Sequence, residues 1–177
     1  MLKPALYLSF ILAFGLLQIG CTPPQKEKSL SLSKINIVVF LGVECPISQQ
    51  YSLTLEKLKD QFDAIDSMTF TAIFPEQISL SEANEFLNTY TLSFDPFIDK
   101  DLEWVKKLNA SVTPEVFILT QDYKILYQGA IDNWYVRLGE NRQHISQHFL
   151  GDNLQALING ANLPYPKTKA IGCLIEK

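Results

Sequence analysis

The sequence has few of the residues from which metal and nucleic-acid sites are built. It contains 3 cysteines and 2 histidines, and its 15 Lys and Arg against 19 Asp and Glu give a net charge of −4. The histidines, His144 and His148, have a spacing that on a helix provides half of a metal site. We expect both to face solvent, and we predict no metal or other cofactor. Without a cluster of Lys and Arg, nucleic acid is excluded as the default partner.

The sequence also lacks an apolar run of the length that a membrane span needs. The run over residues 6–17 is shorter than the roughly 20 residues of a transmembrane helix. It follows Lys3, which supplies a short basic start, and it precedes the small residue Gly20. These are the parts of an export signal, which we predict over residues 1–20.

The pair Gly20-Cys21 resembles the lipobox of bacterial lipoproteins, in which the cysteine is lipidated and becomes the first residue of the mature chain. The resemblance implies lipidation of Cys21 and a membrane-anchored protein of the bacterial cell envelope, facing the periplasm or the exterior. Residues 21–33, rich in Pro, Lys and Ser, would be a flexible tether. An ordinary secreted protein and an uncleaved anchor remain alternatives.

Residues 34–177 are predicted to form one α/β domain. A hydrophobic content of 47% and a charged content of 19% suffice for one buried core. Hydrophobic patterning predicts strands over 35–41, 68–74, 115–119 and 124–130, a short extended piece over 95–99, and helices over 46–65, 79–90, 101–108 and 152–159. This order predicts a mixed sheet with helices on both faces, and a long irregular stretch over 131–144.

Helix caps can be predicted from the same patterns. Ser79 or Ser81 begins the second helix, with Glu82 as a capping-box partner of Ser79. Asp101 and Asp152 are expected to cap the third and the fourth helix.

The first helix opens with Cys45-Pro46, directly after a buried strand and a short turn. Proline is favoured at the first helical position. The helix dipole and free N–H groups at that end favour a cysteine thiolate, which is the nucleophile in thiol–disulfide exchange and in peroxide reduction. The neighbouring Glu44 acts in the opposite direction. A small buried cysteine in a strand-to-helix turn is the alternative interpretation.

Two segments resemble the thioredoxin superfamily. Residues 40–48 (FLGVECPIS) are similar to its active-site segment, and residues 112–118 (VTPEVFI) to its cis-proline strand. Residues 127–132 (YQGAID) and the terminal Gly172-Cys173 are similar to segments of the bacterial redoxin branch related to the AhpC/TSA family. The resemblance implies a thioredoxin-like three-layer α/β/α sandwich with a mixed central sheet.

Carried over by position, the resemblance makes Cys45 the nucleophile and Pro114 the cis-proline. It also assigns Thr113, Pro114 and Pro46 to the substrate-binding groove. The chain departs from the superfamily at Ser48, which stands where a Cys-x-x-Cys motif has its resolving thiol. It departs from typical peroxiredoxins at Gly42, which occupies the position of their peroxide-binding Thr.

Cys173 is the candidate replacement for the missing thiol. Three interpretations remain open: Cys173 resolves a mixed disulfide on Cys45, the two form a structural disulfide, or Cys173 is a free thiol in a docked tail. In the irregular stretch, Asp132 and Arg142 are expected either to line the mouth of the pocket or to form a surface ion pair.

The sequence therefore predicts an exported thioredoxin-like enzyme of thiol–disulfide exchange, with Cys45 and Cys173 as catalytic residues. Its partners would be a protein or small-molecule thiol or disulfide, an external electron donor, and the membrane through lipid on Cys21. A weak peroxidase and a non-catalytic binding or scaffold module are the alternatives.

Overall fold

The computed structural model describes residues 35–62, 65 and 67–176. The predicted export signal, the lipidation site at Cys21 and the tether all lie outside these residues. Within the part of the chain that is described, no helix combines the length and the apolar character needed to cross a membrane.

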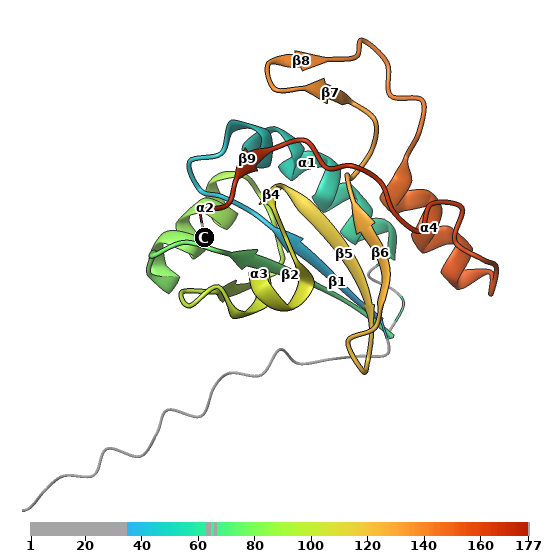
Figure 1. Ribbon diagram of the computed structural model, residues 1–177, viewed down its shortest axis with the longest axis horizontal. Helices are drawn as coiled ribbons and strands as arrows, with labels where there is room; N and C mark the ends of the chain where they lie inside the picture. Colours follow the sequence, from blue (N-terminus) through green and yellow to red (C-terminus); the bar gives the residue numbers. More distant parts are fainter. Residues whose placement is uncertain (1–34, 63–64, 66, 177) are drawn as a thin grey trace, which may run out of the picture.

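A five-stranded mixed sheet forms the centre of the domain (Figure 1). Its order is β3 (Asp95–Ile98), β2 (Met68–Phe74), β1 (Ile35–Phe40), β5 (Glu115–Thr120) and β6 (Ile125–Gly129). The first three strands are parallel, whereas β5 runs antiparallel to β1 and β6 antiparallel to β5. The predicted mixed sheet and the hairpin that closes it are thus confirmed.

Helices cover both faces of this sheet. The helices α1 (Pro46–Phe62), α2 (Leu80–Thr89) and α4 (Phe149–Ile158) share one hydrophobic cluster, and α3 (Glu103–Leu108) belongs to the other. The expected three-layer α/β/α sandwich with a mixed central sheet is confirmed.

The central strand β1 supplies side chains to both clusters. Ile37 and Val39 belong to the cluster of α1, and Val38 and Phe40 to that of α3; all four are fully buried. Alternation of side chains across a strand explains this division. A strand that is buried on both faces reads as a continuous apolar run, which is why the sequence identifies β1 clearly.

The predicted cap of α2 is confirmed. Ser79 accepts a hydrogen bond from the Glu82 N–H at 3.2 Å, and Glu82 Oε2 accepts one from the Ser79 N–H at 2.8 Å. The cap expected at Asp101 is wrong. Buried Asp99 satisfies the first turn of α3 instead, because its carboxylate accepts from the N–H groups of Trp104 and Val105 at 3.2 and 2.9 Å.

The last helix begins before the predicted cap at Asp152. Its first residue is Phe149, and His148 precedes it without a side-chain capping bond. Tertiary contacts explain the earlier start, because Leu150 is fully buried and its N–H donates to the Ile131 carbonyl at 3.0 Å. The two histidines therefore do not share a helix: His144 lies in the preceding loop and is exposed.

Four short strands were not predicted. The stretch over 131–144 contains an antiparallel hairpin of β7 (Tyr135–Arg137) and β8 (Glu140–Asn141), which projects from the domain in Figure 1. Near the site, β4 (Val112–Thr113) pairs antiparallel with β9 (Cys173–Leu174). Strands this short offer too little alternation for a sequence pattern to identify them.

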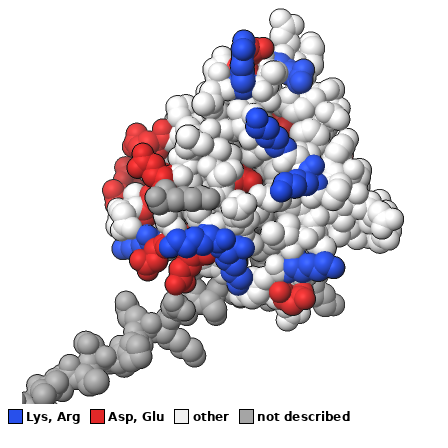
Figure 2. Space-filling model, in the orientation of Figure 1, with Lys and Arg blue, Asp and Glu red and all other residues white. Residues whose placement is uncertain are grey.

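Charged side chains are unevenly distributed over the surface. On the face shown in Figure 2, Lys and Arg side chains are scattered among uncharged residues, and acidic side chains gather at the left edge, near α2. The sulfur site described next is formed by β4, β9 and the start of α1.

Candidate functional site

Cys45 lies at the junction between the turn after β1 and the first helix. Its N–H donates to the Gly42 carbonyl at 3.1 Å, and its own carbonyl accepts from the Gln49 N–H at 3.1 Å. Pro46 is the first residue of α1, at the position where a missing N–H costs nothing. The placement of this cysteine at a helix N-terminus, predicted from the sequence, is confirmed.

Cys173 reaches the same place from the other end of the chain. The pairing of β9 with β4 aligns Cys173 with Thr113. This brings the Cys173 sulfur to 2.6 Å from the Cys45 sulfur, and both cysteines are free thiols. A disulfide bond is about 2.05 Å long, so the two sulfurs can bond after little movement.

The two sulfurs differ in exposure. Cys45 is 4% exposed, whereas Cys173 is half-buried. The helix N-terminus led us to expect the nucleophile at Cys45, yet in this arrangement Cys173 is the more accessible of the two.

The pKa of Cys45 is lowered from its ordinary value. Burial on its own raises this pKa, but hydrogen bonds from Cys173, from the N–H and hydroxyl of Ser48, and from Thr113 stabilise the thiolate and outweigh it. Ser48 is fully buried at the position of the missing thiol, and its hydroxyl also accepts from the Gly42 N–H at 3.2 Å. The serine that cannot resolve a disulfide thus helps to stabilise the nucleophile.

The pKa of Cys173 moves in the opposite direction, to about 11. Burial is the largest cause, followed by the hydrogen bond to Cys45 and by the charge of Cys45; a smaller contribution comes from Glu76. The two shifts are opposite in direction, so Cys45 is the thiol of the pair that ionises first.

The residues expected to bind substrate surround this pair. The Thr113–Pro114 peptide bond is cis, as the resemblance implies, and both residues are buried. The Thr113 carbonyl lies 3.0 Å from the Cys45 sulfur. Pro46 is exposed on the first turn of α1. The structure brings all of these residues to one site, but the backbone of Thr113 is already paired with β9.

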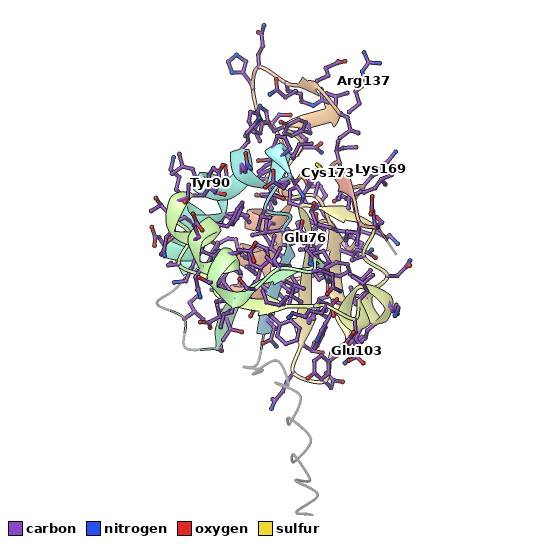
Figure 3. All side chains as sticks on the ribbon, turned by 90° about the vertical axis from the view of Figure 1, so that its left-hand side faces the viewer. Glu76, Tyr90, Glu103, Arg137, Lys169 and Cys173 are labelled. Carbon is purple, nitrogen blue, oxygen red and sulfur yellow. The ribbon has the colours of Figure 1, made fainter. Side chains whose placement is uncertain are left out.

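Glu76 is a site residue that the sequence reasoning missed. It follows β2, is half-buried, and accepts from the Val43 N–H at 3.4 Å. Burial is the main cause that raises its pKa, and the charge of Glu44 adds to it. Figure 3 shows Glu76 and Cys173 on the same side of the molecule. The sequence could have indicated Glu76, because this residue follows β2 and the carboxyl ends of the parallel strands β1 and β2 meet at the edge where Cys45 lies.

Glu76 also lines a groove beside the cysteines. This groove has a volume of about 460 Å³, and Thr113 and Leu174 form part of its wall. The exposed Leu174 of β9 thus lies between Cys173 in the chain and a groove of mixed polar and apolar lining.

A buried polar pair lies on the other side of the cis-proline. The Tyr51 hydroxyl donates to Asp132 Oδ1 at 2.6 Å, and the Trp134 N–H donates to the same oxygen at 2.8 Å. Burial and this carboxylate raise the pKa of Tyr51. Asp132 is 3% exposed, so it forms no surface ion pair with Arg142, which donates to the Asn133 carbonyl at 2.9 Å.

This pair connects the projecting hairpin to α1. The ring of Tyr51 contacts those of Trp134 and Tyr135 at centroid distances of 5.5 and 5.9 Å. Tyr51, Asp132 and Tyr135 line a cavity of about 10 Å³ together with Pro114 and Ile171. Asp132 Oδ2 is buried and has no hydrogen-bond partner among the described residues. Tyr51 falls within the helix predicted over 46–65, and the apolar spacing of that helix gave no sign of the hydroxyl contact.

Comparison with known proteins gives structural matches alone. No protein-family model and no curated protein matches the chain. An uncharacterized conserved protein from Geobacillus kaustophilus is similar with a TM-score of 0.70 and 23% identity, over 82% of this chain and 78% of that one. A hypothetical protein from Sinorhizobium meliloti 1021 is similar with a TM-score of 0.68 and 21% identity, over 81% and 79%.

The name of a third similar structure states its fold. It is the thioredoxin domain of a thiol-disulfide oxidoreductase from Bacteroides vulgatus, with a TM-score of 0.52 and 11% identity, over 72% of this chain and 81% of that one. At these identities the likeness concerns the fold.

Proposed function

From the premise that this chain has the thioredoxin-like fold, we propose that it is a thiol–disulfide oxidoreductase whose redox pair is Cys45 and Cys173. The observation that carries the proposal is the geometry of the two thiols. Their sulfur atoms lie 2.6 Å apart, and the pKa of Cys45 is lowered whereas that of Cys173 is raised. A nucleophile with a lowered pKa beside a second thiol is what exchange through a mixed disulfide needs.

In the first step, the Cys45 thiolate attacks one sulfur of a substrate disulfide. A bond forms between Cys45 and that sulfur, the substrate S–S bond breaks, and the other substrate sulfur leaves as a thiolate. Cys45 alone provides the electron pair, and the displaced thiolate takes up a proton from solvent.

In the second step, Cys173 displaces the substrate from Cys45. Two causes of its raised pKa, the hydrogen bond to the Cys45 thiolate and the negative charge of that thiolate, disappear once Cys45 is in a mixed disulfide. Cys173 then loses its proton to solvent more readily and attacks the Cys45 sulfur. The Cys45–Cys173 disulfide forms, and the second substrate sulfur leaves as a thiolate. The two electrons have passed from the protein dithiol to the substrate, and an external dithiol donor restores the pair.

Trapping of the mixed disulfide tests this order of events. The full chain with Cys21→Ser is mixed with a small disulfide, and the products are identified by intact mass. Cys173→Ser should accumulate the mixed disulfide on Cys45, whereas the parent chain should proceed to the internal disulfide. Cys45→Ser is the matched control: it removes the attacking sulfur, and it should accumulate little adduct because burial still raises the pKa of the remaining Cys173.

Two experimental outcomes would refute the proposal and favour another function. An internal disulfide that dithiol reductants cannot open in the native protein would indicate a structural bond and a non-catalytic scaffold. Peroxide consumption that depends on Cys45, without exchange activity, would indicate the weak peroxidase.

We also propose that the protein acts in the bacterial cell envelope, anchored through lipid on Cys21. The support is the sequence of residues 1–21 and the presence of a cysteine pair that an oxidising compartment can maintain. Metabolic labelling with a fatty-acid analogue tests the anchor: label should enter the parent chain and be absent from Cys21→Ser.

A further inference from the structure

The last residues of the chain occupy a strand edge next to Cys45. Residues 169–176, here called the C-terminal arm, follow a fixed point at Thr168. The Thr168 hydroxyl accepts from the Ala130 N–H at 2.9 Å, and its N–H donates to the Gln128 carbonyl at 3.0 Å. Beyond that point the arm runs to β4, where β9 pairs with Val112–Thr113.

The arm is held by backbone pairing with β4 and by one buried side chain, that of Ile175, which is 9% exposed and belongs to the cluster of α3. Cys173 and Leu174 pair with Thr113 and Val112, and the Ile175 N–H donates to the Ser111 carbonyl at 3.0 Å. The Leu174 side chain is 81% exposed, so it contributes little to this contact. The edge therefore recognises an extended chain whose cysteine points at Cys45.

Gly172 shows which residue can precede a cysteine that pairs with β4. A Cβ atom at this position would come within 2.2 Å of the Thr113 carbonyl oxygen and 2.6 Å of its carbon. Real Cβ atoms do not approach backbone atoms so closely, and the Thr113 carbonyl is backbone rather than the end of a flexible side chain. The residue before the cysteine must consequently be glycine for the pairing to keep this geometry.

We propose that the β4 edge is a binding site for an extended cysteine-containing peptide with glycine directly before the cysteine, and that the C-terminal arm vacates the edge to admit it. This inference rests on the proposed function and specifies its substrate. The arm is the template for the ligand, because it presents the sequence Gly-Cys-Leu-Ile to the same edge.

Departure of the arm is compatible with the rest of the fold. The residues before it remain fixed through Thr168 and through Tyr165, whose N–H donates to Asn153 Oδ1 at 3.1 Å. The pairing with β4 covers two residues, but its opening also withdraws the buried Ile175 side chain from the cluster of α3. The arm is therefore released by exchange with a ligand that fills the same positions. When it opens, Cys45 loses the cover that leaves it 4% exposed.

The reaction of a bound peptide follows from this geometry. With the peptide cysteine supplied as a mixed disulfide with thionitrobenzoate, the Cys45 thiolate attacks the peptide sulfur. A Cys45–peptide disulfide forms, the bond to thionitrobenzoate breaks, and the thionitrobenzoate anion leaves with the electron pair. Its absorbance reports the rate.

The test compares two peptides on one full-length protein. The chain carries Cys21→Ser and Cys173→Ser, so that Cys45 is its single thiol. The first peptide has the sequence Ala-Ile-Gly-Cys-Leu-Ile, and the second has alanine in place of the glycine. We expect the glycine peptide to react roughly tenfold faster, the effect of losing one or two backbone hydrogen bonds. The difference should disappear on the urea-unfolded chain.

A second measurement varies the arm itself. In the same background, Gly172→Ala should displace the arm and accelerate the reaction of Cys45 with a small disulfide. Lys169→Ala is the matched control and should leave that rate unchanged, because this arm residue is exposed and lies outside the pairing with β4.

The outcomes separate this inference from the proposed function. If Cys45 reacts with the small disulfide but both peptides react equally fast, the peptide site is refuted and the exchange function stands. If Cys45 of the folded chain reacts with no probe, even in Gly172→Ala, both are refuted.

Discussion

Cys45 and Cys173 place their sulfur atoms 2.6 Å apart although 128 residues separate them in the chain. Oxidation of this pair would close a loop that contains nearly the whole described domain. On the chain-entropy account, such a loop restricts the unfolded state by about 5 kcal/mol. We expect the oxidised protein to be more stable than the reduced protein by up to this amount. Urea denaturation with and without reductant measures the difference, and coincident unfolding curves would contradict it.

The second prediction concerns the hydrogen bond between these two residues. A donor on Cys173 helps to lower the pKa of Cys45, so its removal should raise that pKa. Cys173→Ala should shift the thiolate titration of Cys45 to higher pH, as followed by ultraviolet absorbance or by the pH dependence of alkylation. Cys173→Ser keeps a hydroxyl donor and should shift it less. Identical titrations in the two variants would show that the contact does not influence the thiolate.

The third prediction concerns Glu76, whose charge contributes to the raised pKa of Cys173. Glu76→Gln removes that charge, so the pKa of Cys173 should fall and more of it should be ionised at a given pH. Release of a mixed disulfide from Cys45 should therefore be faster in the variant, and the advantage should shrink at high pH, where Cys173 is ionised in both proteins. Stopped-flow measurement of substrate release across pH tests this.

A matched control for that experiment is available in the same groove. Glu176→Gln removes a carboxylate from an exposed position on the groove wall. It does not contribute to the pKa of Cys173 and should leave the release rate unchanged. An equal acceleration in both variants would indicate a general effect of net charge.

The fourth prediction concerns the buried pair of Tyr51 and Asp132. Tyr51→Phe and Asp132→Ala each remove one partner of a hydrogen bond at 2.6 Å, and each should lower the free energy of unfolding by about 1–3 kcal/mol. The double variant should cost less than the sum, because the second change removes a group that already lacks its partner. Urea denaturation of the four proteins completes the cycle, and additive losses would show that the two residues are uncoupled.

Asp132→Asn separates hydrogen bonding from charge in this pair. The amide keeps an oxygen that can accept from Tyr51 and from the Trp134 N–H. We expect Asp132→Asn to be closer to the parent in stability than Asp132→Ala. A loss as large as that of the alanine variant would indicate that the negative charge itself is needed.

The sequence by itself determined the elements whose signals are local. The apolar run of β1, the helix that starts at Pro46 and the capping box of Ser79 and Glu82 depend on neighbouring residues, so they could be read directly. The same holds for the position of Cys45 at a helix N-terminus. These features, in their order along the chain, were enough to predict the layers of the fold.

The tertiary structure decided what depends on contacts between distant segments. The first turn of α3 is capped by buried Asp99 and not by Asp101, which is exposed. Packing of Leu150 makes α4 begin earlier than its sequence pattern predicts. Local patterns carry no information on which of two nearby carboxylates will be buried. The position of Glu76 after a strand parallel to β1 could have been read from the sequence, but its contact with the Val43 N–H depends on the tertiary structure.

The two cysteines show the division most clearly. Their identity as the candidate redox pair came from the sequence, which left open whether Cys173 resolves, cross-links or stands free. Pairing of β9 with β4 then decided that the sulfurs meet, and that the arm carrying Cys173 covers Cys45. A two-residue strand has almost no signature of its own, because its position is set by the edge that receives it and by the glycine that lets the backbones approach.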